Sequence, residues 1–251
     1  RRHTRFRNVT GVQTCALPIS WLAALGAGAG VLTRQYELFA VSGFIAAASR
    51  TWQRGSLVVA VALLPAAALC WLWHGLAPVS DMRTVYLAEP IRFHLPWLSL
   101  YLAAPGIYAA PVVVWALIDR RPGMWPTAMA AAIACVTVAF PVQPAPFQVA
   151  NCCPDAGYVH RALLATGRPW LVLTVFFVAS AAWLAPALDR LQADVTRWCT
   201  APPRAADLFP WLALASFLVL MPLSYMPWEK YALPELFVVF LVLARPRASI
   251  S

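Results

Sequence analysis

Long apolar runs separated by short polar loops constrain the fold of this chain more than any other feature. A helix that crosses a bilayer needs about 20 mostly apolar residues. The hydrophobic share of 61%, against 12% charged residues, is far from that of an ordinary soluble domain. The sequence therefore predicts an all-α fold, a polytopic transmembrane bundle of about eight spanning helices. The predicted spans are residues 21–32, 38–48, 57–77, 97–118, 124–140, 169–188, 208–223 and 232–244, with 21–48 as one long helix in the alternative reading.

Residues 1–19 differ in character from the rest of the chain. Segment 9–19, VTGVQTCALPI, matches one translated frame of a common sequencing adaptor, and the basic residues before it fit the end of the same oligonucleotide. The alternative is a basic targeting peptide with a short apolar core. We interpret 1–19 as a non-native segment, which makes 20–251 a single transmembrane domain lacking its natural N-terminal part.

The charge of the chain indicates membrane orientation rather than nucleic-acid binding. The formal net charge is +9, but four of the 19 basic residues and none of the 10 acids lie in 1–19, which leaves +5. The remaining arginines are scattered over short loops and form no basic patch. The loops alternate in charge, and the positive-inside rule places the richer set in the cytoplasm. That set is Arg50, Arg54, Arg120, Arg121, Arg190, Arg197, Arg204, Arg245 and Arg247, whereas the outer set is Arg34, Arg83, Arg92, Arg161, Arg168 and Lys230.

The composition also indicates a source and a location. Lys230 is the only lysine of the chain, and alanine and proline are abundant, with 22 prolines in 251 residues. This bias is typical of a GC-rich bacterial genome. Together with the apolar runs, it predicts a multi-pass protein of the cell inner membrane whose first partner is the lipid bilayer.

Polar residues at the predicted outer helix ends are candidate substrate-binding residues. The planar guanidinium of Arg34 suits bidentate capture of a phosphate, and Lys230, next to Tyr231, can bind an anionic headgroup as a point charge. The alternatives are structural, with Arg34 reaching the headgroups while it pairs with Glu37 one turn away, and Lys230 acting as an interfacial anchor. Glu235 lies one turn deeper, where a carboxyl group must be paired, protonated or wet.

The sequence contains no recognisable metal or cofactor motif. It has no P-loop, no CxxC and no GxSxG, and we expect neither a bound metal nor a cofactor. Asp81 and Glu89 share one outer loop and are candidates for acid–base chemistry, although loop acids are usually solvated. The histidines on the predicted outer side, which show neither HxxxH nor HxxE spacing, are His74, His94 and His160.

Two short motifs resemble membrane glycosyltransferases of the GT-C superfamily, which use polyprenyl-phosphate sugars. Segment 26–43 has a Gly-rich helix ending in Leu-Thr-Arg, and segment 228–234, WEKYALP, resembles the late (D/E)-(K/R)-Tyr-Leu-Leu-Pro helix entry. The resemblance implies sugar transfer from a polyprenyl-phosphate-linked donor on the extracytoplasmic side. It also implies that Arg34 and Lys230 hold the donor phosphate. The catalytic carboxylate of that superfamily lies in the first outer loop, which this chain lacks, so the catalytic residue is unknown and the fragment is expected to be inactive.

Two other functional classes compete with this interpretation. A transporter or permease subunit without enzymatic activity would bind its substrate near the midplane, at broken helices and often in repeated halves. The charges of this chain gather at the outer edge and no internal repeat is present, which disfavours transport. A membrane scaffold with no small-molecule site is the third possibility.

Overall fold

The fold is entirely helical over the part of the chain that the computed structural model describes, so the predicted all-α class is confirmed there. The described residues are 93–144, 155–201, 205–223 and 232–244, with positions 64, 68, 71, 72, 149 and 203. The helices are α5 (Leu95–Tyr108), α6 (Ala110–Arg120), α7 (Met124–Ala139), α9 (Tyr158–Leu164), α10 (Pro169–Thr200), α11 (Ala205–Leu220), the 3₁₀ turn η2 (Met221–Leu223) and α12 (Leu233–Ala244).

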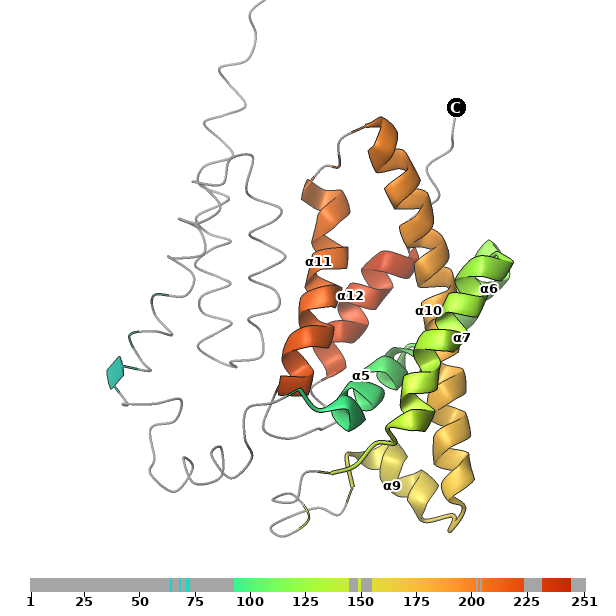
Figure 1. The fold of residues 1–251 in the computed structure, drawn as a ribbon, viewed down its shortest axis with the longest axis vertical. Helices are drawn as coiled ribbons and strands as arrows, with labels where there is room; N and C mark the ends of the chain where they lie inside the picture. The colour runs from blue at the N-terminus through green and yellow to red at the C-terminus, as the bar shows by residue number, and fades with distance from the viewer. Residues whose placement is uncertain are drawn as a thin grey trace, which may run out of the picture.

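The helices run in alternate directions and give the bundle two ends (Figure 1). At the first end, the Ser99 hydroxyl of α5 donates to the carbonyl oxygen of Phe140, just after α7, at 2.6 Å. The N–H of His94 donates there to the carbonyl oxygen of Pro222 in η2, at 3.0 Å. At the second end, α6, α10 and α12 finish and α11 begins. Five predicted helical regions, from 97–118 to 232–244, are helical in the structure, and they alternate between these ends as expected.

Helix α10 forms the centre of the core and packs on α7 and α5. Trp183 of α10 is fully buried and donates its indole N–H to the carbonyl oxygen of Leu102 in α5, at 2.6 Å. Tyr101 of α5 meets Phe217 of α11 edge to face, with ring centroids 5.5 Å apart. Because a buried indole needs a hydrogen-bond partner, the Trp183 contact fixes both the depth and the rotation of α10 against α5.

Gly106 allows α5 and α10 to approach backbone to backbone. A Cβ atom built at this position would overlap the carbonyl group of Ala179 in α10. Small residues permit such close helix contacts in membrane bundles, where packing rather than the hydrophobic effect drives association. The α5–α10 contact therefore requires glycine at position 106.

The predicted span 97–118 is not one straight helix, because the chain bends by 77° between α5 and α6. Ala109 lies at the break with φ −103° and ψ 23°. Pro105 lies inside α5, and Pro111 lies in the first turn of α6. Proline lacks the N–H that would continue the hydrogen bonds of the preceding helix and is tolerated at a helix start, which explains why the chain breaks and restarts here.

The predicted span 169–188 ends too early, because α10 continues through the polar residues that follow it to Thr200. Its 32 residues correspond to about 48 Å at 1.5 Å per residue, against a hydrocarbon thickness of about 30 Å. An i,i+4 ion pair between Arg190 and Asp194 stabilises the added turns. The helix ends just before two consecutive prolines, which cannot continue it. A further helix, α9, lies between the predicted spans 124–140 and 169–188.

The predicted count of about eight spanning helices is not confirmed. Among the described residues, only α10 is by itself long and apolar enough to cross a membrane, and α5 with α6 would be a second, bent candidate. The shorter apolar helices are Met124–Ala139, Asp207–Leu223 and Leu233–Ala244. Three of the predicted spans, 21–32, 38–48 and almost all of 57–77, lie outside the described residues.

Candidate functional site

All four predicted substrate-binding residues lie outside the described part of the chain. Arg34 and Glu37 precede it, and Lys230 and Tyr231 fall between η2 and α12. Their predicted roles therefore stay predictions. Helix α12 starts three residues after Lys230, at the first end of the bundle, so the described residues at that end form the surroundings in which a site at the predicted mouth would be built.

Glu235, in the first turn of α12, is fully buried at 0% exposure. Within the described part of the chain, neither of its carboxyl oxygens has a hydrogen-bond partner. The large apolar residues around it on the same helix point outward instead, since Leu233 and Phe237 are 61% and 64% exposed. Helix α12 thus carries its only acid on the buried face and large apolar side chains on the exposed face, the reverse of a water-soluble surface helix.

The periodicity of α12 shows that this orientation involves the whole helix. Glu235 begins a buried stripe with i, i+3, i+4 and i+7 spacing, and Phe240 continues the exposed stripe. The other members of the buried stripe are Val238, Val239 and Val242. An apolar residue at 235 would complete this stripe without cost, whereas a carboxyl group buried without a polar partner lowers stability.

A second buried acid, Asp155, is fully engaged in a local turn. It accepts a hydrogen bond from the backbone N–H of Gly157 at 3.1 Å and from Nε of Arg161 at 2.7 Å. Nearby, the backbone N–H of Ala156 donates to Nδ1 of His160 at 3.1 Å. These contacts hold the start of α9, which packs on α10.

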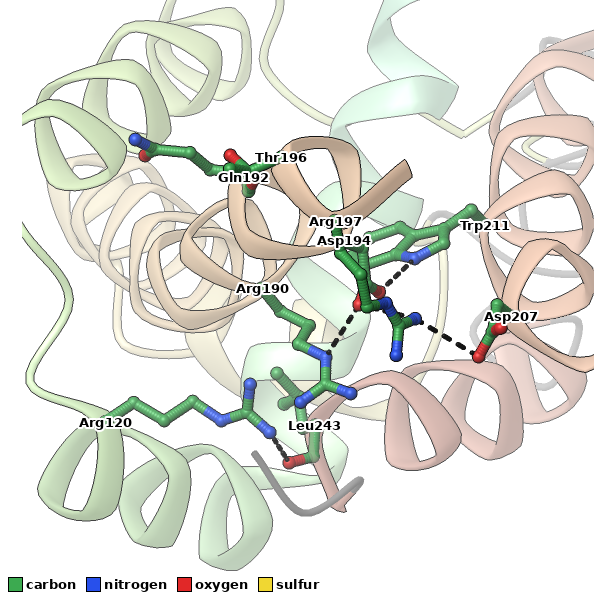
Figure 2. Close-up of polar contacts among 9 residues, drawn as sticks. All are labelled: Arg120, Arg190, Gln192, Asp194, Thr196, Arg197, Asp207, Trp211 and Leu243. Atoms are coloured by element: carbon green, nitrogen blue, oxygen red, sulfur yellow. Dashed lines mark hydrogen bonds and ion pairs between the residues drawn. The ribbon is translucent and has the colours of Figure 1, made fainter. Parts of the chain in front are cut away.

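The largest polar cluster of the described residues lies at the second end and centres on Asp194 (Figure 2). The Asp194 carboxylate of α10 lies 3.5 Å from Nε of Arg190 and 3.4 Å from a terminal nitrogen of Arg197. It also accepts a hydrogen bond from the Trp211 indole of α11 at 3.0 Å. Arg197 in turn reaches Asp207, at the start of α11, at 3.3 Å. These five residues, the Asp194 cluster, connect the end of α10 to the beginning of α11.

Arg120 performs a similar connecting role between α6 and α12. Its side chain is buried and donates to the carbonyl oxygen of Leu243 at 2.7 Å. The last carbonyl groups of a helix lack intrahelical donors and carry partial negative charge, so a guanidinium from a neighbouring helix stabilises the end of α12. In Figure 2 the Arg120 side chain lies near that of Arg190, at the edge of the Asp194 cluster.

Several arginines that the loop-charge pattern assigns to the same side of the membrane lie at the same end of the bundle. Arg120, Arg190 and Arg197, all assigned to one side, lie at the second end, whereas His94 and Arg161 of the other side do not join them. The Asp194 cluster lies between the predicted spans 169–188 and 208–223, in a stretch that hydropathy does not mark as a helix. The i,i+4 spacing of Arg190 and Asp194 and the i,i+3 spacing of Asp194 and Arg197 were the available signals.

No group of three potential metal ligands occurs in the described residues. His94 stacks on Trp97 with ring centroids 3.7 Å apart, and His160 packs against Phe176. Both described histidines are thus in contact with aromatic rings of the bundle. His74, Asp81 and Glu89 lie outside the described part.

Comparison of the chain with known protein families, with curated proteins and with solved structures gives no match.

Proposed function

We propose that this chain belongs to a multi-pass membrane glycosyltransferase that transfers a sugar from a polyprenyl-phosphate donor on the extracytoplasmic side. In this reaction the bond from the anomeric carbon to the lipid phosphate breaks, and a bond to an acceptor hydroxyl forms. The lipid phosphate leaves with the electron pair of the broken bond, and the acceptor proton passes to a base. Cations placed at the phosphate would stabilise its developing charge.

The observation that carries the membrane part of the proposal is the reversed polarity of α12. Glu235 is at 0% exposure, while Leu233, Phe237 and Phe240 are 61%, 64% and 47% exposed. Ionisable residues in membrane helices almost always face the bundle interior or a water-filled cavity, and apolar side chains face lipid. Water would disfavour this pattern, whereas acyl chains favour it.

The exposed aromatic residues and the charges of α10 agree with such a placement. Trp170 lies near the start of α10, and the first acid of the helix is Asp189. Their separation corresponds to about 28 Å of helix, close to the hydrocarbon thickness of about 30 Å. Membrane interfaces favour large aromatic rings. Such rings, each more than half exposed, occur near both ends of the bundle: Trp125 at the second end, and Tyr158 and Trp170 at the first.

The transferase part of the proposal rests on the two motifs and their cations. Arg34 ends the Gly-rich motif and Lys230 lies within WEKYALP. An arginine and a lysine at one outer mouth supply a bidentate donor and a point charge to the same phosphate. Glu37 and Tyr231, adjacent to these cations in the sequence, complete the proposed binding set.

The test uses the gene with residues 1–19 replaced by its natural upstream sequence. Membranes containing this protein are assayed for transfer of labelled sugar from a polyprenyl-phosphate sugar, and Arg34→Ala and Lys230→Ala are expected to raise KM for the donor and lower kcat. Arg54→Ala, which removes an arginine from a predicted cytoplasmic loop, is the matched control and should leave both unchanged. Unaltered donor kinetics in the Arg34 and Lys230 variants would refute the phosphate role.

A labelling experiment tests the geometry independently of activity. Single cysteines at positions 34 and 230 are treated with a membrane-impermeant maleimide on intact cells. Both positions should label from the outside. Labelling from opposite faces would leave no shared pocket for the phosphate and would remove the physical basis of the transferase proposal.

One observation favours transport as a second candidate function. The break of 77° between α5 and α6 creates a discontinuous helix in the bundle, and discontinuous helices form substrate sites in many transporters. Uptake of a labelled substrate into proteoliposomes, without chemical change of that substrate, would support transport. Transfer of the sugar to an acceptor would support the glycosyltransferase.

A further inference from the structure

Glu235 is a buried ionisable residue that the proposed phosphate site does not use. It lies in the first turn of α12, and α12 begins at the first end of the bundle (Figure 1). Its side chain is at 0% exposure, and no hydrogen bond to either carboxyl oxygen is found among the described residues. By contrast, the other buried acids of this part, Asp155 and Asp194, each have two or more polar partners.

The surroundings of Glu235 on α12 argue against a packing role. Val238, Val239 and Val242 share its face and are 3% exposed or less. A leucine or methionine at position 235 would pack with these valines and bury no polar atom. The carboxyl group instead lowers the stability of the bundle, and residues that lower stability are typical of functional sites.

A partner from outside the protein would remove this penalty. A carboxyl group accepts hydrogen bonds through both oxygens, and such bonds are strongest where water is excluded. Sugar hydroxyl groups are donors of the right kind, and the proposed donor substrate carries them beside its phosphate. The proposed cations serve the phosphate of that donor, and Glu235 is the described buried acid whose carboxyl oxygens have no hydrogen-bond partner.

We propose that Glu235 binds the sugar hydroxyl groups of the lipid-linked donor. The inference rests on the proposed function and extends it, because it assigns the sugar-recognising residue of the same site. Glu235 would act as a binding residue that distinguishes the sugar-bearing lipid from the bare polyprenyl phosphate left after transfer. Release of the product would follow from loss of these hydrogen bonds.

The experiment compares Glu235→Met and Glu235→Gln with the parent protein, each carrying the natural upstream sequence. Affinity is measured by titrating undecaprenyl-phosphate mannose and, separately, undecaprenyl phosphate into the purified protein in nanodiscs. Glu235→Met should weaken binding of the sugar-bearing lipid about tenfold or more and leave undecaprenyl phosphate binding unchanged. Glu235→Gln, which keeps a hydrogen-bonding amide, should show a smaller loss.

Thermal stability distinguishes a binding role of Glu235 from a structural one. If the carboxyl group stabilised the fold, Glu235→Met would lower Tm rather than raise it. Without ligand, Glu235→Met should raise Tm by about 3–8 °C, because it removes an unpartnered buried carboxyl group. Phe237→Met, on the exposed face two residues away, is the matched control and should change neither Tm nor affinity. A lower Tm in Glu235→Met would show that the carboxyl group has a partner inside the protein and would overturn the inference.

The remaining outcomes are equally decisive. Unchanged affinity for the sugar-bearing lipid, or an equal loss for both lipids, overturns the assignment of Glu235 while leaving the proposed function intact. If the parent protein binds neither lipid, the proposed function itself fails, and the sugar role of Glu235 fails with it. Weakened binding of the sugar-bearing lipid alone, with a raised Tm, supports both.

Discussion

Asp194→Ala should destabilise the protein more than any other single change at the second end of the bundle. The side chains of Asp194 and Arg190 are 5% and 8% exposed, so removing the carboxylate takes one ion-pair partner from a buried guanidinium. Breaking one member of a buried pair costs about 3–5 kcal/mol. The lost hydrogen bond from Trp211 contributes to this figure, since a bond to a charged acceptor is worth roughly 1.5–3 kcal/mol.

The contribution of Arg197 to this loss should be small. Its side chain is 34% exposed and keeps Asp207 as a second partner at 3.3 Å. Solvent-accessible ion pairs contribute at most about 1 kcal/mol, and Arg197 can retain half of its interactions in the variant. The expected loss therefore comes mainly from Arg190, and about 4 kcal/mol is the value we expect within the range for a broken buried pair.

The mechanism predicts rescue by a second substitution. Arg190→Met in the Asp194→Ala background removes the buried charge that lost its Asp194 partner and keeps an apolar stem of similar length. It should recover roughly 2 kcal/mol, because an apolar replacement of a complete buried ion pair is often neutral. Arg190→Met alone should be destabilising, since it leaves the buried Asp194 with fewer partners.

The assay is equilibrium unfolding of the full chain in mixed micelles, followed by helical circular dichroism during titration with sodium dodecyl sulfate. Thr196→Ala is the matched control, because its exposed hydroxyl bonds only to the Gln192 carbonyl oxygen of its own helix. It should change the free energy of unfolding by less than about 0.5 kcal/mol. A loss below about 1 kcal/mol for Asp194→Ala, or no recovery in the double variant, would refute this account of the cluster.

Three further changes test the packing and the turns. In the same unfolding titration, Gly106→Ala should lower the free energy of unfolding by about 1–3 kcal/mol, because the added Cβ overpacks against the α10 backbone. The control Gly123→Ala should cost less than about 1 kcal/mol, because its added Cβ meets only a side-chain atom at 3.7 Å. Arg121→Gly should raise the free energy of unfolding by up to about 1 kcal/mol, because Arg121 ends α6 in the left-handed region at φ 44°. An unchanged or lower free energy of unfolding would contradict this. Trp183→Phe should lower the free energy of unfolding by about 2–4 kcal/mol, because it removes a buried hydrogen bond and leaves a cavity. Trp170, at 55% exposure, is the comparison. An equal loss for Trp170→Phe would show that burial is not the cause.

The positions of most helices could be predicted from hydropathy alone. Residues 124–140 and 232–244 are predicted to be spanning helices, and the structure has shorter apolar helices there, Met124–Ala139 and Leu233–Ala244. Apolar composition reports whether a segment can be buried or face lipid, and in this chain such segments are helical. It does not report whether a helix is straight, which is why the break at Ala109 escaped it.

The polar contacts could not be predicted from hydropathy because they join distant parts of the chain. Arg120 and Leu243 are separated by 123 positions, and nothing in either local sequence indicates the other. The extension of α10 past Asp189 is different, since the spacing of Arg190 and Asp194 is visible in the sequence. By hydropathy, these charged residues indicate a loop. By helical periodicity, their i,i+4 spacing indicates an ion pair on one helix face.

The uneven use of polar groups at the two ends bears on where a ligand can bind. At the second end, Asp194 is held by its own cluster and Arg120 by the carbonyl oxygen of Leu243, so a ligand there would first have to break protein contacts. At the first end, Glu235 has no such contact to lose among the described residues. Binding is strongest when the protein groups that contact the ligand are already desolvated and make no protein contacts that binding would have to break. Among the described residues, a ligand that needs a buried carboxyl group without protein contacts would meet it at the first end, at Glu235.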